Sequence, residues 1–193
     1  MYKKSKSFIS LLLVAVLTLA SITTPALAYK SLGFKITSTI TFVPYNGFTS
    51  TSIAHMGEAV RKWNTAAGST LMKISSSTHS VTTGYPNTYD RNNYIYRIDV
   101  GPGYVGECCY VYSADGVLRQ ADININVYYP FANSAQPNCY DLYSVFIHEA
   151  GHAAGLDDND SLNTTSVMYV CGPGVAKRDL AVDDIIGIRA IYR

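Results

Sequence analysis

The clearest repeating patterns in the chain are two stretches in which apolar and polar residues alternate. In residues 35–43, Ile36, Ile40 and Phe42 alternate with threonines, and in residues 121–127 isoleucines and a valine alternate with an aspartate and asparagines. Such alternation predicts β-strands. The second strand should turn its apolar face to the core and its polar face to solvent or to a neighbouring layer. Further runs rich in apolar, β-branched or aromatic residues predict strands at 71–74, 94–100 and 109–112.

Apolar residues spaced by three and four predict a long helix early in the chain. Thr51 or Ser52 would cap its N-terminus, and Gly68 would end it. The side chains expected on its buried stripe are Ile53, Met56, Val60, Trp63 and Ala67.

Two more helices are predicted in the last third of the chain. Asp141 is expected to cap a helix that runs to about residue 154. The last helix covers residues 182–192, with Asp183 and Asp184 in its first turn, where negative charge favours the helix dipole. The order of strand, helix, several strands, helix, loop and helix predicts an α+β fold.

The first 28 residues have the composition of a secretory signal peptide. Three lysines precede an apolar run at residues 8–22, which is short for a membrane span, and Ala26 and Ala28 provide a small-residue cleavage site. We therefore predict that residues 1–28 are removed on export and that residues 29–193 form one domain. The remaining chain has two more acidic than basic residues, which gives no reason to expect nucleic acid or a membrane surface as a partner.

Residues 148–158, which read HEAGHAAGLDD, carry the strongest chemical signal. His148 and His152 are four apart, so on a helix both imidazoles face one side and reach a single metal ion. Glu149 would flank that metal without binding it, which suits a carboxylate that takes a proton from water. Gly155 would end the helix in a left-handed conformation and let the chain turn back towards the metal.

Asp158 is the expected third metal ligand, and Asp157 and Asp160 are the nearby acids that compete with it. Two imidazole nitrogens and one carboxylate leave the fourth tetrahedral position open for water, which is the pattern of a catalytic zinc site. A buried helix with two ordinary histidines and a capping glycine is the simpler alternative. The coincidence of three ligands, a base and a helix breaker at workable spacings disfavours it.

The motif HExxHxxGxxD resembles the zinc-binding motif of the metzincin metallopeptidases, most of which have histidine at the last position. Metzincins also have a methionine turn downstream of the motif, and Met168 in the segment 166–169 matches it. The resemblance implies a zincin fold, in which a twisted mixed β-sheet is combined with a long first helix, a zinc-binding helix, a Met-turn and a C-terminal helix.

Within the metzincins the chain is most similar to the matrixins. Residues 141–145 and 180–192 resemble the segment that leads into the matrixin zinc helix and the matrixin C-terminal helix. The aspartate third ligand departs from the usual matrixin histidine and is similar to snapalysin-type enzymes. The matrixin likeness also implies that one of Asp183 and Asp184 holds the ammonium of a mature N-terminus at Tyr29, while the other supports the Met-turn.

The four cysteines are Cys108, Cys109, Cys139 and Cys171. An even number in an exported chain suggests disulfides, and adjacent cysteines rarely bond to each other. We predict two bridges, each of which takes one of Cys108 and Cys109, with Cys139 and Cys171 as their partners in an order that the sequence leaves open. The spacing contains no pair of CxxC motifs, which disfavours an all-cysteine zinc site.

These features predict a secreted, monomeric zinc endopeptidase that acts on protein or peptide substrates, with Glu149 as its base. The alternatives are a secreted binding protein that keeps zinc for structure, and a toxin or amidase of narrow specificity on the same scaffold. An intact Glu149 has little structural purpose, which argues against the binding protein. No acidic cluster accompanies the serine- and threonine-rich residues 75–83, so the sequence gives no support for calcium.

Overall fold

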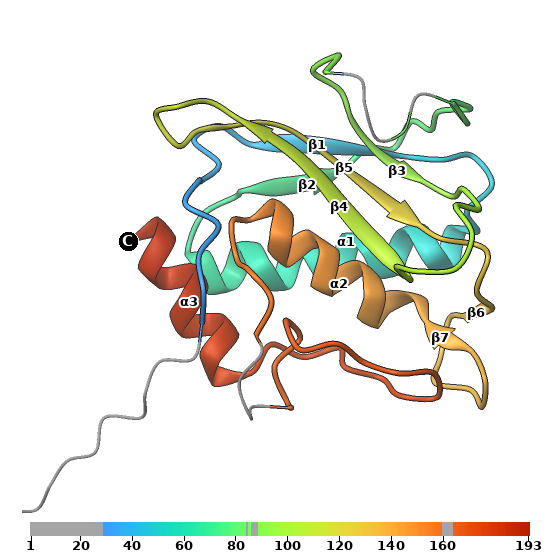
Figure 1. Ribbon diagram of the computed structural model, residues 1–193. Helices are drawn as coiled ribbons and strands as arrows, with labels where there is room; N and C mark the ends of the chain where they lie inside the picture. Colours follow the sequence, from blue (N-terminus) through green and yellow to red (C-terminus); the bar gives the residue numbers. More distant parts are fainter. Residues whose placement is uncertain (1–28, 84, 86–88, 160–163) are drawn as a thin grey trace, which may run out of the picture.

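The computed structural model describes residues 29–83, 85, 89–159 and 164–193. Its described residues form a five-stranded sheet with helices on one face (Figure 1). This arrangement confirms the predicted α+β class. The signal peptide predicted at residues 1–28 lies outside the described residues.

The main sheet has the strand order β2–β1–β3–β5–β4, in which β4 runs antiparallel to its neighbour and the other pairs are parallel. Two short parallel strands, β6 and β7, form a second sheet before the helix that carries the motif. The strands are β1 (Ile40–Pro44), β2 (Met72–Ile74), β3 (Asn93–Tyr96), β4 (Gly106–Tyr112), β5 (Leu118–Ile125), β6 (Phe131–Ala132) and β7 (Tyr140–Asp141).

The strand positions are as predicted, but several boundaries are not. The strand predicted at 35–43 begins only at Ile40, and the one predicted at 94–100 ends at Tyr96. β4 begins three residues before the predicted 109–112, and β5 lies three residues earlier at its start than the predicted 121–127. β6 and β7 were not predicted, because two-residue strands have no measurable periodicity.

The first helix, α1 (Ser50–Ala67), begins at least two residues earlier than its predicted caps allow. Thr49 is the N-cap, and its side chain accepts a hydrogen bond from the Ser52 backbone N–H at 3.1 Å. Four consecutive Ser or Thr residues can each cap a helix, so local sequence could not select among them. Gly68 ends the helix in a left-handed conformation at φ 74°, as predicted.

The helix α2 (Leu142–Ala153) crosses the same face of the sheet and packs against α1, β4 and β5. Asp141 caps it, as predicted, and accepts a hydrogen bond from the Ser144 N–H at 3.1 Å. Trp63 is fully buried between α1 and α2 and donates from Nε1 to the Ile147 carbonyl at 2.9 Å. The α1–α2 packing therefore fixes the position of the motif helix under the sheet.

The polar face of β5 is covered by a neighbouring segment of the chain rather than by solvent. Asp122, Asn124 and Asn126 are all buried, and each accepts a hydrogen bond from a backbone N–H in residues 94–100, at 2.8, 3.0 and 3.2 Å. The sequence left open whether this polar face meets solvent or a neighbouring layer, and the solvent alternative is wrong. Buried polar side chains need partners, and here the backbone of β3 and of the residues that follow it provides them.

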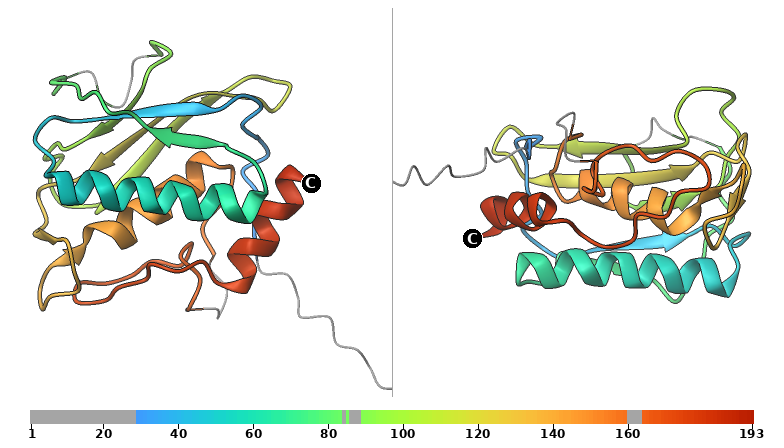
Figure 2. Two further views of the ribbon diagram at one scale, coloured as in Figure 1. Left: turned by 180° about the vertical axis from the view of Figure 1, so that it is seen from behind. Right: turned by 90° about the horizontal axis from the view of Figure 1, so that it is seen from below.

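The described N-terminal residues run between residues 154–158, the loop that follows α2 (the motif loop), and the last helix, α3 (Val182–Tyr192) (Figures 1 and 2). Leu32 donates its N–H to the Gly155 carbonyl at 2.8 Å, and the Lys30 carbonyl accepts from the Asp157 N–H at 2.9 Å. Among the described residues, no helix combines the length and the apolar character needed to span a membrane.

Candidate metal site

The two motif histidines lie one turn apart on α2 and point their Nε2 atoms at each other. Each Nδ1 makes a hydrogen bond of 2.9 Å with a backbone carbonyl, His148 with Val167 and His152 with Leu156. A carbonyl can only accept, so Nδ1 carries the proton and Nε2 presents its lone pair. The two Nε2 atoms are 3.1 Å apart, and the rings are nearly perpendicular, at 89°.

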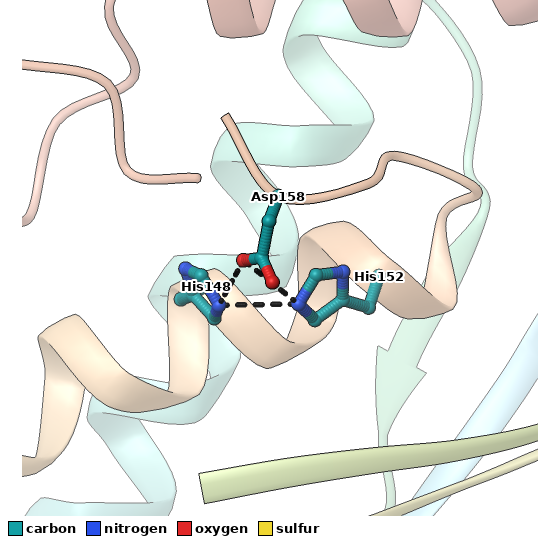
Figure 3. A group of neighbouring side chains, drawn as sticks. All are labelled: His148, His152 and Asp158. Carbon is teal, nitrogen blue, oxygen red and sulfur yellow. Dashed lines mark hydrogen bonds and ion pairs between the residues drawn. The ribbon is translucent and has the colours of Figure 1, made fainter. Parts of the chain in front are cut away.

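Asp158 completes a three-residue cluster with these histidines (Figure 3). Its Oδ1 lies 3.3 Å from His148 Nε2 and 3.6 Å from His152 Nε2. Gly155 makes this approach possible, because its φ of 94° reverses the chain and an added Cβ would collide with the Phe34 carbonyl oxygen. In the part of the chain that the structure describes, this is the one group of metal-ligand side chains within 4.8 Å of one another.

The geometry of this cluster fits a zinc ion. Two nitrogens at the usual Zn–N distance and a tetrahedral angle would lie about 3.3 Å apart, close to the separation found here. Two lone pairs facing each other repel unless a cation lies between them. The Asp158 Oδ1 is buried and has no hydrogen-bond partner, which is costly for a carboxylate unless a cation occupies the space beside it.

The competing acids differ in position. Asp157 lines the same cleft but is not part of the three-residue cluster, and its Oδ1 accepts a hydrogen bond from the Asp158 N–H at 2.8 Å. Asp160 lies outside the described residues. The cluster therefore brings together His148, His152 and Asp158 in the combination expected from the motif.

Glu149 lies next to this cluster and is 5% exposed. Burial raises the pKa of its carboxyl to about 7, although the neighbouring His148 opposes the shift. Its space is provided by Gly106 at the start of β4, where an added Cβ would come within 2.8 Å of the Glu149 carboxylate. The carboxyl thus lies against β4, an edge strand of the sheet.

Met168 lies in a turn that packs against α2 between the two histidines. It is buried, and an added Cβ on Gly151 would collide with its sulfur. The turn also positions the ligands, because the Val167 carbonyl holds His148 and the Met168 carbonyl accepts from the Asn159 N–H at 2.9 Å.

Asp184 of α3 supports this turn. The matrixin resemblance implied this role for one of the pair Asp183 and Asp184. Its carboxylate accepts from Ser166 Oγ at 2.5 Å and from the Val167 N–H at 2.9 Å. A rigid chain of contacts therefore leads from α3 through Val167 to the His148 ring.

A cleft of about 590 Å³ runs past the cluster. One side is formed by β4, the edge strand, together with residues 103–105 that precede it. Tyr169, Val170, Cys171 and Gly172, which follow the Met-turn, also line the cleft. The sequence did not indicate which strand lies at the edge, since strand order depends on pairings between distant segments.

The two predicted disulfides are not present in the structure, which contains all four cysteines as free thiols. Neighbouring residues of a strand point to opposite faces, and Cys108 and Cys109 diverge in this way. Cys108 packs against the core, whereas Cys109 Sγ lies 3.4 Å from the Tyr85 hydroxyl on the other face. Cys108 and Cys109 are therefore poorly placed to bond two partners that lie on the same side of the strand. Cys171 lies in the other segment that lines the cleft.

The two remaining histidines lie away from this site. His79 packs among Tyr45, Tyr94 and Tyr96, and its Nε2 lies 3.1 Å from the Ile95 carbonyl. His55 packs beside the Tyr143 ring. Neither belongs to the metal-ligand cluster of the described residues.

Sequence reasoning missed the residues that shape the site without carrying its chemistry. Gly106 and Tyr104 line the cleft, and Lys177 holds its wall through a hydrogen bond from Nζ to the Tyr169 carbonyl at 3.0 Å. The glycine that opens the apolar run at 106–112 was the one signal available for them, because it marks a close approach of backbone and side chain.

The chain is similar to known proteins at the level of a family model and of solved structures. A family model described as Matrixin matches residues 31–193. No curated protein sequence matches the chain. Among solved structures, the GM1-bound form of the ECX AB5 holotoxin is 14% identical with a TM-score of 0.44 and covers 80% of each chain. High choriolytic enzyme 1, a hatching enzyme zinc-protease from the medaka fish Oryzias latipes, is 15% identical with a TM-score of 0.43, covering 82% of this chain and 93% of its own. At these TM-scores neither likeness bears on what this chain does.

Proposed function

Because the chain belongs to the matrixin family and is therefore a zinc metalloendopeptidase, we propose that His148, His152 and Asp158 hold its zinc and that Glu149 is its general base. The observation that carries this proposal is the convergence of the two Nε2 atoms and the Asp158 carboxylate on one point at the bottom of a cleft. The buried Glu149 carboxyl beside them supports its role.

We further propose that the substrate is an extended peptide that pairs with the free edge of β4. An edge strand offers unpaired N–H and C=O groups that an added strand can bond. The β4 edge borders the cleft along its length, from Gly106 to Tyr110. Such pairing would align the scissile bond beside Glu149 and the metal ligands.

When bound, zinc supplies Lewis-acid chemistry, which polarises a carbonyl and makes water acidic enough to lose a proton near neutral pH. Glu149 takes that proton as the water oxygen bonds to the carbonyl carbon. The same carboxyl then gives the proton to the departing amine nitrogen as the C–N bond breaks. Its buried position beside β4 keeps this proton transfer away from bulk solvent.

We also propose that the protein acts outside the cell. Removal of the segment 1–28 on export would leave one catalytic domain, residues 29–193, that acts outside the cell as a monomer. The described residues of this domain surround one hydrophobic core. Sequencing the N-terminus of the exported protein should find Tyr29 as its first residue.

Replacing Glu149 with Gln tests the function most directly. Glutamine fills the same space but accepts no proton, so zinc content should stay at one per chain while cleavage of casein or of a quenched peptide falls about 10³-fold. A wild-type protein that binds zinc and cleaves no peptide would instead favour the binding protein or the narrow amidase. Equal cleavage by wild type and variant would remove Glu149 from the mechanism.

A further inference from the structure

The motif loop acts on two of the three residues of the metal-ligand cluster. It carries Asp158 at its end, and its Leu156 carbonyl accepts a hydrogen bond from His152 Nδ1 at 2.9 Å. That bond orients the His152 ring and leaves its Nε2 free for a metal. A shift of the loop would therefore displace His152 and Asp158 together, whereas His148 is held separately, from the Met-turn.

The loop begins at a residue whose carbonyl is held by the last helix. Ala154 is the C-cap of α2 and is fully buried, at a helix end where carbonyls lack a partner within the helix. Tyr192, the last residue of α3, donates its hydroxyl to that carbonyl at 3.0 Å. The same hydroxyl accepts from the Ile36 N–H at 2.9 Å. One oxygen atom thus connects α3, the N-terminal segment and the first residue of the loop.

The proton of this hydroxyl is not lost near neutral pH. Burial raises the pKa of Tyr192 to about 12, although the hydrogen bond from Ile36 opposes the shift. The hydroxyl therefore remains a donor to the Ala154 carbonyl throughout the neutral range.

The other contacts of the loop set its distance from α3 but not its orientation. An added Cβ on Gly187 of α3 would come within 2.9 Å of the Leu156 side chain, so helix and loop pack closely. The loop also pairs with residues 30–32. Apolar packing has no preferred direction, whereas a hydrogen bond does. The Tyr192 hydroxyl is thus the directional contact between α3 and the start of the loop, at Ala154.

Building on the proposed function, we propose that Tyr192 is a positioning residue of the metal centre. Its hydroxyl fixes the start of the motif loop, and the loop in turn orients His152 and brings Asp158 to the zinc. Tyr192 is not among the residues that line the cleft, so it acts only through the loop. A bond that merely stabilised the fold would change the unfolding of the protein but not the lifetime of its bound zinc.

The test replaces Tyr192 with Phe, which removes the hydroxyl and keeps the ring. The matched control is Tyr129→Phe, because the Tyr129 hydroxyl makes the same pair of bonds elsewhere. It accepts from the Gly103 N–H at 3.0 Å and donates to the Gly103 carbonyl at 3.1 Å. For each exported, zinc-loaded protein, the rate of zinc release to an excess of a coloured chelator is measured. Urea unfolding of the zinc-free proteins is measured alongside.

We expect Tyr192→Phe to release zinc about tenfold faster than wild type, since loss of a contact that supports a metal ligand costs roughly 10–100-fold in affinity. Tyr129→Phe should stay within about twofold of wild type. Both substitutions should lower the urea midpoint by similar amounts, because each removes one hydroxyl with two hydrogen bonds. Unchanged zinc release in Tyr192→Phe, or equal acceleration in Tyr129→Phe, would overturn the inference.

A second measurement follows the route of the effect. In the zinc-loaded protein with isotope-labelled histidine, the Nδ1–H signal of His152 reports its bond to Leu156, and that of His148 reports its bond to Val167. Tyr192→Phe should shift the His152 signal and leave the His148 signal in place. Equal shifts of both signals, or no shift of either, would overturn the inference while the peptidase function stands. A wild-type protein that takes up no zinc would overturn the proposed function itself.

Discussion

Gly151 of α2 packs closely against the core, because an added Cβ would collide with the Met168 sulfur and approach the Trp63 ring to 2.9 Å. Overpacking of a filled core typically costs 1–3 kcal/mol. We expect Gly151→Ala to lower the free energy of unfolding by about 2 kcal/mol, measured by denaturant titration of the zinc-free protein.

A second glycine provides the control for that substitution. Gly57 lies in α1, and an added Cβ there would meet nothing within 4 Å. Alanine is the better helix former, so Gly57→Ala should raise stability by about 0.5–1 kcal/mol. A loss of stability at Gly57 equal to that at Gly151 would mean that contact with Met168 is not the cause.

The identity of the third metal ligand can be tested by substitution. Asp158 belongs to the cluster and Asp157 does not, so Asp158→Ala should release zinc while Asp157→Ala should retain it. Removal of one of three protein ligands is expected to lower zinc affinity by at least 100-fold, since loss of a supporting contact alone costs 10–100-fold. Zinc content after dialysis against a weak chelator decides between them, and loss of zinc only from Asp157→Ala would contradict the assignment.

The residues of the metal cluster could be inferred from sequence because one helix and one turn carry all of them. The periodicity of a helix fixes which residues share a face, and a glycine signals the turn that follows. Gly106 and Val167 act on the site from distant parts of the chain, the first by leaving room for Glu149 and the second by holding His148. A glycine such as Gly106 can signal a close approach, but no local pattern shows which distant residue it approaches.

Among the elements, α2 depends on an ion pair at its N-terminus. Asp141 is fully buried, and its carboxylate accepts from Arg178 Nε at 2.9 Å and from Ser144 Oγ at 2.6 Å. Burial acts to raise the pKa of Asp141, but the hydrogen bonds from Arg178 and Ser144 outweigh it and lower the pKa below its usual value. The cap is therefore most effective when Asp141 is ionised.

The sign of the pH dependence follows from that lowered pKa. The stabilisation provided by the ionised Asp141 carboxylate is fully present above the unfolded-state pKa of about 4. It is lost as the pH falls through the lower folded-state pKa. At neutral pH, Asp141→Asn should cost about 3 kcal/mol, because it leaves a partly buried Arg178 without its charge partner. Urea denaturation of the zinc-free proteins should show the gap between wild type and variant narrowing below pH 4. A gap that does not depend on pH would exclude the ionised carboxylate as the source.

Helices were easier to predict than strands for a physical reason. The three helices were placed to within about two residues because their periodicity and caps are local. The five strands of the main sheet were located, but their ends depend on partners far away in sequence. In the segment 94–100, the N–H groups of Ile98 and Val100 bond to the side chains of Asn124 and Asn126 instead of to a strand backbone, so β3 ends at Tyr96.

At the scale of the whole molecule, the N-terminal residues join the motif loop to the last helix. Tyr29 packs tightly on α3, since an added Cβ on Gly187 would come within 2.8 Å of its Cβ. Asp183 lies one helical turn before Gly187, and Asp184 already supports the Met-turn. We expect a free ammonium at Tyr29 to pair with Asp183, so extension by two residues before Tyr29 should lower kcat/KM several-fold. Equal rates for the two forms, purified separately and assayed on one peptide, would remove this role.

The pairing of residues 30–32 with residues 155–157 has a consequence for timing. The stretch immediately before Asp158 takes its shape from a segment that the ribosome made more than a hundred residues earlier. We therefore expect metal capture to follow the docking of residues 30–32 on residues 155–157, so that a chain in which these segments have not yet met binds no zinc and cleaves nothing.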